Sequence, residues 1–145
     1  MIARKITYSQ LEKAIRVAFE EDKQIVELYN PNIKVETVDD VIKSISEQIF
    51  EIKDLCICKG VYDKEKLVGY YVYTDMLLIS FSLSSQYRIR TYLREFFGMI
   101  RKDLGKKFVC RVWNRNIRAI KWLLKNDLEV IEDKEDIVQL VYLKQ

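Results

Sequence analysis

The chain has 145 residues, of which 49% are apolar and 32% are charged, and its formal net charge is +3. This length is typical of a single core, so we expect residues 1–145 to form one domain. The apolar content excludes a disordered chain, and four Gly and one Pro exclude a collagen-like or linker sequence. No apolar run approaches the ~20 residues of a membrane span, and the N-terminus lacks the apolar stretch of a signal peptide.

The chain contains three cysteines and no histidine. An odd number of cysteines without a secretory signal is typical of reduced thiols, which predicts a cytoplasmic protein. Cys56 and Cys58 form a single Cys-x-Cys pair, and no second pair or histidine completes a zinc site. We therefore expect these thiols to pack in a strand and expect no metal. The absence of histidine also excludes Ser-His and Cys-His nucleophile systems.

A short strand and a helix are predicted at the start of the chain. The strand covers residues 2–6. Ser9 stands three residues before Glu12, which is the spacing of a capping box, and apolar residues then recur at helical spacing. We therefore predict a helix over residues 9–21. Its buried side chains are expected to be Leu11, Ala14, Ile15, Ala18 and Phe19.

A second helix is predicted after a break in the chain. Asn30-Pro31-Asn32 contains strong turn signals and predicts that break. Asp39 or Asp40 supplies an N-cap for the next helix. Its buried stripe is predicted to comprise Val41, Ile42, Ile45, Ile49 and Phe50.

From Leu55 onward, the apolar pattern is that of strands. Residues 55–61 and 67–73 are predicted to pair as a hairpin around a polar turn. Asp75 marks the next turn. Residues 76–83 are nearly continuous in apolar character, which is typical of a strand that is covered on both faces.

The last third of the chain alternates helices with strands. A helix over residues 87–104 ends at Gly105, which suits a C-cap. A strand over residues 108–113 leads to a final helix over residues 115–126. That final helix is predicted to be buried through Ile117, Ile120 and Leu124.

Val130 and residues 137–143 supply the closing strands, and we expect the strand near Val138 to Leu143 to form an exposed edge. The predicted order is β-α-α-β-β-β-α-β-α-β-β. This order indicates an α/β (α+β) fold with a mixed central sheet of about six to seven strands and about four flanking helices. No repeat or linker divides the chain.

The final helix carries a motif that consists of Asn116, Ala119, Trp122 and Lys125, followed by Asp127 and Leu128. It resembles the fourth-helix motif of the GNAT acetyltransferase superfamily, in which Gly and Phe stand at the last two positions. The order of elements over residues 55–143 also matches that superfamily. The resemblance implies a GNAT fold, with acetyl-CoA as the cofactor.

A strand that runs into a basic helix start occupies the place of the family's pyrophosphate loop. The family's loop begins with Arg or Gln and has small residues three and five positions later, because backbone N–H groups must approach a diphosphate closely. Here Arg88 is followed by Thr91 and Leu93 at those positions. The charge of an anion site is therefore kept better than its shape. The resemblance implies that the cofactor-binding residues are Leu83, Arg88, Ile89, Arg90, Thr91 and Asn116.

The chain lacks the catalytic acid that the resemblance implies. Acetyl transfer needs a base to deprotonate the amine and an acid to protonate the leaving thiolate. In the family, a Tyr seven residues after the motif Asn often acts as that acid, and here the residue is Leu123. Tyr87, Tyr92 and Asp75 are the candidates to replace it. The alternative for the tyrosines is packing of the sheet against its helices.

Basic residues are concentrated in one segment, from Arg88 to Lys125. It contains twelve basic and two acidic residues, which gives a net charge of +10. Such a segment attracts phosphate-bearing partners, either CoA or nucleic acid. The alternative is a solvated polar face on two amphipathic helices. No zinc finger or RNP sequence accompanies the segment.

Three functions remain open from the sequence. The C-terminal half is most similar to the small divergent GNAT-like proteins of tailed bacteriophages, through the strand end Leu83-Ser84, the long basic helix and Trp113 before the final helix. Some of those proteins are carried in the virion. We therefore expect first a phage-encoded pseudoenzyme, in the host cytoplasm or the virion, in which binding is kept and acetyl transfer is weak or lost. An active acetyl-CoA-dependent N-acetyltransferase and a nucleic-acid-associated basic protein are the alternatives.

Overall fold

A computed structural model describes residues 1–29 and 32–144. Strands in this part of the chain form one mixed sheet in the order β1-β2-β3-β4-β5-β7-β6, and all neighbours are antiparallel except β4 and β5. The strands are β1 (Ile2–Lys5), β2 (Ile57–Asp63), β3 (Lys66–Thr74), β4 (Leu77–Leu83), β5 (Lys107–Trp113), β6 (Glu129–Lys134) and β7 (Ile137–Leu143). The helices are α1 (Tyr8–Phe19), α2 (Ile25–Leu28), α3 (Val38–Ile52), α4 (Arg90–Leu104) and α5 (Ile117–Lys125), with 3-10 turns η1 (Lys53–Leu55) and η2 (Ser85–Tyr87).

The predicted α+β class and the predicted order of elements are confirmed, with α2 as an additional short helix. The predicted break at residues 30–32 falls largely on residues 30 and 31, which lie outside the described residues. Gly105 ends α4 with a positive φ of 87°, a conformation that favours glycine, as predicted for a C-cap.

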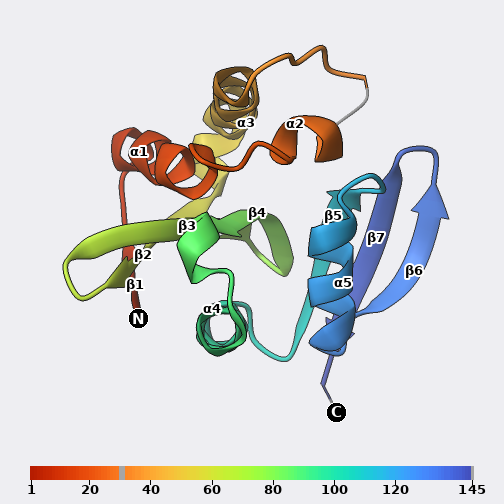
Figure 1. Ribbon diagram of the computed structural model, residues 1–145. Helices are drawn as coiled ribbons and strands as arrows, with labels where there is room; N and C mark the ends of the chain where they lie inside the picture. The colour runs from red at the N-terminus through yellow and green to blue at the C-terminus, as the bar shows by residue number, and fades with distance from the viewer. Residues whose placement is uncertain (30–31, 145) are drawn as a thin grey trace.

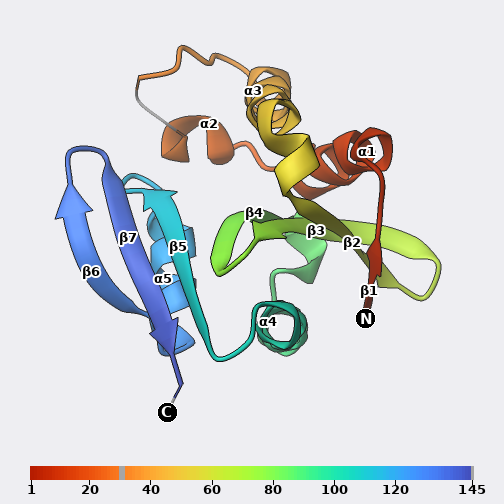
Figure 2. The same ribbon diagram turned by 180° about the vertical axis from the view of Figure 1, so that it is seen from behind.

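Helices cover both faces of the sheet, as Figures 1 and 2 show from opposite sides. α1 and α3 pack over β2 and β3, whereas α4 and α5 pack on the other face. Tyr70 and Tyr71 are neighbours on β3 and therefore point to opposite faces. Both are fully buried, Tyr70 in the core with α1 and α3 and Tyr71 in the core with α4. β3 is thus covered on both sides.

Threonines start the two long N-terminal helices. The N–H of Gln10 donates to Thr7 Oγ1 at 3.3 Å and the N–H of Thr7 donates to Gln10 Oε1 at 2.9 Å, which completes a capping box. The predicted start at Ser9 is therefore wrong by one to two residues. Thr37 caps α3 in the same way, and Asp40 is its partner in the box. The prediction that Asp39 or Asp40 is the cap is corrected accordingly.

Two predicted buried faces differ from the structure. Phe50 in α3 is 51% exposed. On α5, Ile117 and Leu124 are exposed, whereas Leu123 is fully buried. The run of three apolar residues from Trp122 to Leu124 leaves the buried face ambiguous in the sequence. The orientation found turns the largest of these side chains, Trp122, toward the core, where it removes the most apolar surface from water.

Within the part of the chain that is described, β4 and β5 share only two residue pairs, which lie at the start of β4 and in the middle of β5. Leu77 pairs with Val109 and Leu78 with Cys110, and beyond these residues the two strands diverge (Figure 1). The register between β3 and β4 shifts at the same point, which leaves Ile79 as the extra residue of a β-bulge. A bulge bends the strand that carries it. The bulge therefore accounts for the opening of the sheet beside the start of α4.

The C-terminal edge of the sheet is β6. β7 pairs with β5 on one side and β6 on the other, so the prediction of an exposed edge near Val138 to Leu143 is wrong. Val138, Leu140 and Tyr142 are buried. The physical reason is that the chain passes beyond β5 to form β6 and then returns between them, which an element order alone does not show.

The three cysteines are free thiols. Cys58 and Cys110 are buried, whereas Cys56 is half-buried just before β2 and packs on the same core as Cys58. Among residues 1–29 and 32–144, no group of three or more His, Cys, Asp or Glu is arranged to hold a metal ion. In the same part of the chain, no helix has the length and hydropathy that crossing a membrane requires.

Candidate binding site

A cavity of about 1150 Å³ lies where β4 and β5 diverge. Its wall includes Ile45 and Ile79, which pack on the core under α1 and α3. It also includes Phe81 and Trp122, which pack on the core under α4 and α5. The cavity therefore reaches both faces of the sheet through the gap between the strands. This volume slightly exceeds the range of roughly 300–1,000 Å³ that small-molecule sites occupy, so the cavity can hold a ligand of that size.

The cavity wall is strongly basic. None of the described residues that line it is acidic. The lining cations are Arg88, Arg90, Arg94, Arg111, Arg118, Lys121 and Lys125. All seven belong to the basic segment that the sequence predicts, and all except Arg88 and Arg118 are exposed. A cleft that is lined by one sign of charge concentrates its field and attracts anions.

The first turn of α4 adds a second source of positive potential. The residue before this helix, Ile89, provides no side-chain hydrogen bond to cap it and is 55% exposed. The first turn contains no acidic residue, and Arg90 and Leu93 from this turn line the cavity. The N–H groups at a helix N-terminus carry partial positive charge. The uncapped turn and the lining cations therefore favour the same kind of ligand, an anion.

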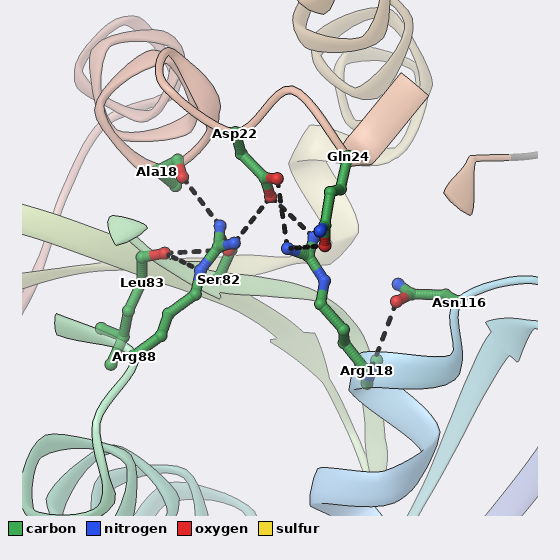
Figure 3. Close-up of polar contacts among 9 residues, drawn as sticks. Ala18, Asp22, Gln24, Ser82, Leu83, Arg88, Asn116 and Arg118 are labelled. Atoms are coloured by element: carbon green, nitrogen blue, oxygen red, sulfur yellow. Dashed lines mark hydrogen bonds and ion pairs between the residues drawn. The ribbon is translucent and has the colours of Figure 1, made fainter. Parts of the chain in front are cut away.

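Arg88 is engaged in contacts within the protein (Figure 3). Its Nε donates to Leu83 O at 2.7 Å, and its Nη1 donates to Asp22 Oδ2 at 2.6 Å. Its Nη2 donates to Ala18 O at 3.0 Å and to Ser82 Oγ at 3.1 Å. These four bonds use four of the five guanidinium N–H groups. Arg88 therefore fixes the loop between β4 and α4 against α1, and it is less available to a ligand than Arg90 or Arg94.

Asp22 does not line the cavity itself but lies between two arginines that do, Arg88 and Arg118 (Figure 3). Besides the bond from Arg88, it accepts bonds from Arg118 Nη1 at 3.1 Å and Arg118 Nη2 at 2.7 Å. Its side chain is 3% exposed. Burial raises the pKa of the Asp22 carboxyl, but the hydrogen bonds from Arg118 and Arg88 outweigh it and hold the pKa below its usual value. Asp22 is therefore an ionised carboxylate that joins the α1–α2 connection to α5.

Asp22 is a site residue that the sequence does not predict. A single acidic residue after a helix has no periodic or motif signal, and its partners lie 66 and 96 residues away in the chain. The excess of basic residues from Arg88 to Lys125 was the one available hint, because so many cations favour an acidic partner from elsewhere in the chain.

The three candidate acid–base residues do not line the cavity. The Tyr87 hydroxyl donates to Asp63 Oδ2 at 2.7 Å, and this hydrogen bond raises the pKa of Tyr87. The ring centroids of Tyr87 and Tyr92 are 4.7 Å apart, so the two side chains pack on each other. Asp75 is exposed in the turn between β3 and β4. The structure therefore does not bring these three residues together with the basic wall.

The structure places some, but not all, of the residues that the resemblance assigns to cofactor binding at the cavity. Leu83, Arg88, Arg90 and Asn116 line the cavity, whereas Ile89 and Thr91 do not. Asn116 accepts a bond from the N–H of Ala119 at 3.3 Å and so caps α5. Four of the six residues thus share one cavity, and they come from both walls of the gap.

Trp122 forms part of the cavity floor. Its ring is stacked on Phe96, with centroids 5.6 Å apart, and also contacts Phe81 and Phe97 at 5.4 and 5.8 Å. The next residue, Leu123, is fully buried in the core and does not line the cavity. The position at which the family often carries a tyrosine therefore contributes neither a hydroxyl nor any contact to this site.

Comparisons with known proteins identify the fold. No protein-family model matches the sequence, and no curated protein matches it significantly. The PaiA N-acetyltransferase of Thermoplasma acidophilum, solved in complex with coenzyme A, is 17% identical with a TM-score of 0.69, and the match covers 99% of this chain and 98% of that one. An acetyltransferase of Thermus thermophilus is 12% identical with a TM-score of 0.68, covering 97% and 96%. The ribosomal-protein-S5-alanine acetyltransferase of Vibrio fischeri is 16% identical with a TM-score of 0.57, covering 97% and 91%.

These similarities extend over nearly the whole chain at low sequence identity, so they establish the fold of the protein. The predicted GNAT fold is confirmed.

Proposed function

We propose that this protein binds a phosphate-bearing thioester carrier of the coenzyme A type in the cavity between β4 and β5, and that it transfers the acyl group weakly or not at all. The observation that carries the proposal is the basic cavity, without an acidic lining residue in the described chain, at the point where the two strands part. The complex of the similar Thermoplasma enzyme with coenzyme A supports this class of ligand.

The positive charge at the α4 end of the cavity is complementary to the negative charge of a diphosphate. Arg90 and Arg94 are four residues apart on α4, and Lys121 and Lys125 are four residues apart on α5, so each pair lies on one helix face. All four are exposed and line the cavity. These side chains and the uncapped N–H groups of the α4 first turn would hold the phosphates from two sides. The carrier, when bound, supplies the thioester.

The described wall of the cavity offers no general base for acyl transfer. It contains no Asp, Glu, His or Cys. Its tyrosines, Tyr29 and Tyr70, have hydroxyls that are hydrogen-bonded to Ser44 at 2.9 Å and to Ser80 at 2.8 Å. Burial raises the pKa of both phenols, which makes them weaker acids. An amine bound here would keep its proton, and the leaving thiolate would lack a good donor, so transfer is slow.

A binding role agrees with the resemblance of the C-terminal half to the GNAT-like proteins of tailed phages. We extend the proposal to a pseudoenzyme that acts as one domain in the infected host cell or in the virion. Detection of the protein in purified virions by mass spectrometry would support the virion location. Its recovery from the host lysate alone would exclude that location and support the host cytoplasm.

Titration calorimetry with coenzyme A and acetyl-CoA tests the binding site. We expect dissociation constants of about micromolar order for the wild type, and Arg90→Glu to weaken binding by at least about tenfold because it reverses a charge at the phosphates. Lys102→Glu is the matched control. It makes the same change in charge on the same helix, about 18 Å farther along the axis, and we expect affinity to stay within about twofold. No heat at millimolar ligand, or equal losses in both variants, would overturn the proposal.

Release of free thiol from acetyl-CoA, followed with a thiol reagent, tests the loss of transfer. With a panel of primary amines and polyamines, we expect no rate above that of the protein-free control. Turnover at the typical enzyme rate of roughly 1 s⁻¹ or more would contradict this part of the proposal and support the active N-acetyltransferase.

A second basic cluster favours one other candidate function, nucleic-acid binding. Arg101, Lys102, Lys106 and Lys144 border a hollow of about 380 Å³ at the end of α4. Clustered cations bind a phosphate backbone with a steep dependence on salt. Retention of DNA that falls as salt rises, and that weakens in Lys102→Glu, would support this function. Retention that is independent of salt would exclude it.

A further inference from the structure

The half of the cavity under α2 and α3 is apolar. None of the described lining residues from α1, α2 or α3 is charged. The aliphatic side chains of this wall are Ile25, Leu28, Ile45, Ile49, Ile52 and Ile79. We call these six residues the aliphatic wall. Ile25 and Ile49 are almost fully buried, whereas the other four are half-buried and remain accessible from the cavity.

Polar groups in this half of the cavity are already satisfied. Gln48 Nε2 donates to the Tyr29 hydroxyl at 2.9 Å, and that hydroxyl donates to Ser44 Oγ at 2.9 Å. The hydroxyls of Tyr70 and Ser80 are 2.8 Å apart. In the described chain, no buried side-chain nitrogen or oxygen lacks a partner. A polar occupant would lose its hydration and gain few hydrogen bonds in return, whereas an apolar occupant would lose nothing.

The aliphatic wall and the basic wall belong to one continuous cavity. Ile79, the extra residue of the β-bulge, lies on the aliphatic side, and Phe81, two residues later on β4, packs toward α5 and the basic side. A single molecule that satisfies both halves carries a phosphate-bearing head and an aliphatic chain. An acetyl group has too few carbons to contact the six side chains of the aliphatic wall, and the lost contacts would go unreplaced.

We infer that the aliphatic wall binds a chain of several carbons attached to the phosphate-bearing head, so that the ligand class is a medium-chain acyl thioester. The identity of the phosphate-bearing head depends on the proposed function. The acyl chain of the ligand is inferred independently, from the aliphatic wall. A lipid phosphate of similar chain length presents the same two features, and the experiment below separates the two sources.

Calorimetric titration with a series of acyl-CoA thioesters tests the inference. The series runs from CoA through acetyl-, butanoyl- and hexanoyl- to octanoyl-CoA, and octyl phosphate serves as a probe without the carrier. Complete burial of one methylene is expected to tighten the dissociation constant by about fourfold. We therefore expect a gain of about a hundredfold between acetyl- and hexanoyl-CoA, allowing for incomplete burial, together with a heat capacity change that becomes more negative with chain length.

A variant that fills the aliphatic side checks where the chain binds. Ile45→Phe adds a ring to the aliphatic wall at a half-buried position, and Leu55→Phe adds one at a residue that is 75% exposed and does not line the cavity. We expect Ile45→Phe to remove the dependence on chain length and to leave the affinity for CoA itself within about twofold. Leu55→Phe should retain both properties. If Ile45→Phe fails to fold by circular dichroism, Ile45→Gln tests the same wall without added bulk.

The possible outcomes separate this inference from the proposed function. Binding of CoA with affinity that is independent of chain length overturns the acyl-chain inference and leaves the proposed function intact. Octyl phosphate that binds tightly, through the wall that Ile45→Phe blocks, while CoA thioesters do not bind, supports an aliphatic site for a lipid phosphate and overturns the proposed function. Binding of none of these probes overturns both.

Discussion

Replacement of Asp22 by Asn removes the negative charge from between Arg88 and Arg118 and leaves the size of the side chain almost unchanged. The carboxylate accepts three hydrogen bonds from the two guanidinium groups, at 2.6, 2.7 and 3.1 Å. An amide presents one acceptor oxygen, and its NH₂ group would face a cation. The variant therefore tests how much this contact stabilises the fold.

The expected loss of stability follows from the burial of the three groups. Loss of one partner from a buried ion pair costs about 3–5 kcal/mol. The Asp22 side chain is 3% exposed, so its contact is in that class, but Arg118 is 39% exposed and regains water when released. Arg88 keeps its bonds to Ala18 O and Leu83 O. We therefore expect a loss of about 3 kcal/mol, which lowers Tm by roughly 10 °C in a chain of this length.

Urea unfolding at pH 7, followed by circular dichroism, measures this loss. Arg118→Met is the comparison variant. Asp22 then keeps its bond from Arg88, and we expect Arg118, whose side chain is partly exposed, to contribute about 1 kcal/mol or less. The reasoning is refuted if Asp22→Asn lies within about 0.5 kcal/mol of the wild type, which is the usual range for surface substitutions. A larger loss for Arg118→Met than for Asp22→Asn would refute it as well.

The dependence on pH gives a second check of the same contact. The pKa of Asp22 in the folded protein is held below its usual value, whereas in the unfolded chain it is about 3.9. A group whose pKa is depressed by folding contributes its full stabilisation above the unfolded pKa and loses it as pH falls through the folded pKa. The difference between wild type and Asp22→Asn should therefore be constant from about pH 5 to 8 and should shrink below about pH 4.

Three further outcomes follow from local packing. Thr7→Ala removes the cap of α1 and should cost about 1 kcal/mol in urea unfolding, whereas Ser9→Ala should cost less than half of that; equal losses would contradict the observed cap. Trp122→Ala removes the stacked ring of the cavity floor and should cost about 3 kcal/mol, and a loss near zero would contradict that packing. In the folded protein at pH 8, Ellman's reagent should label Cys56 well before Cys110, whose pKa burial raises to about 12, and equal rates would contradict the burial.

The order of strands and helices could be predicted because it depends on local periodicity. The continuous apolar run at residues 76–83 and the stripes of α1 and α4 are each visible within about twenty residues of sequence. The helix boundaries were harder to predict. Thr7 and Ser9 are both good N-caps for α1, and which of them caps the helix depends on how α1 meets the sheet. The buried face of α5 was missed for a similar reason, because three consecutive apolar residues fit more than one orientation.

The positive charge of the candidate site could be predicted from the sequence, whereas the shape of the site could not. The cations from Arg88 to Lys125 are plain in the sequence, and seven of them line one cavity. The contact of Arg88 with Asp22 joins residues that are far apart in the chain, and no local pattern reports such a pair. The aliphatic wall was also out of reach, because its isoleucines look like ordinary core residues until the divergence of β4 from β5 leaves space beside them.

The narrow junction between β4 and β5 has a mechanical consequence. In the described chain, two residue pairs hold the β1–β4 lobe to the β5–β7 lobe within the sheet, and the Asp22–Arg118 ion pair is a further tie between them. Separation of the two lobes at this junction should therefore be the local opening of lowest free energy in the folded protein. Amide hydrogen exchange at Val109, whose N–H donates to Met76 O at 2.8 Å, would report it. A ligand that contacts α4 and α5 together would stabilise the closed arrangement of the two lobes and slow that exchange.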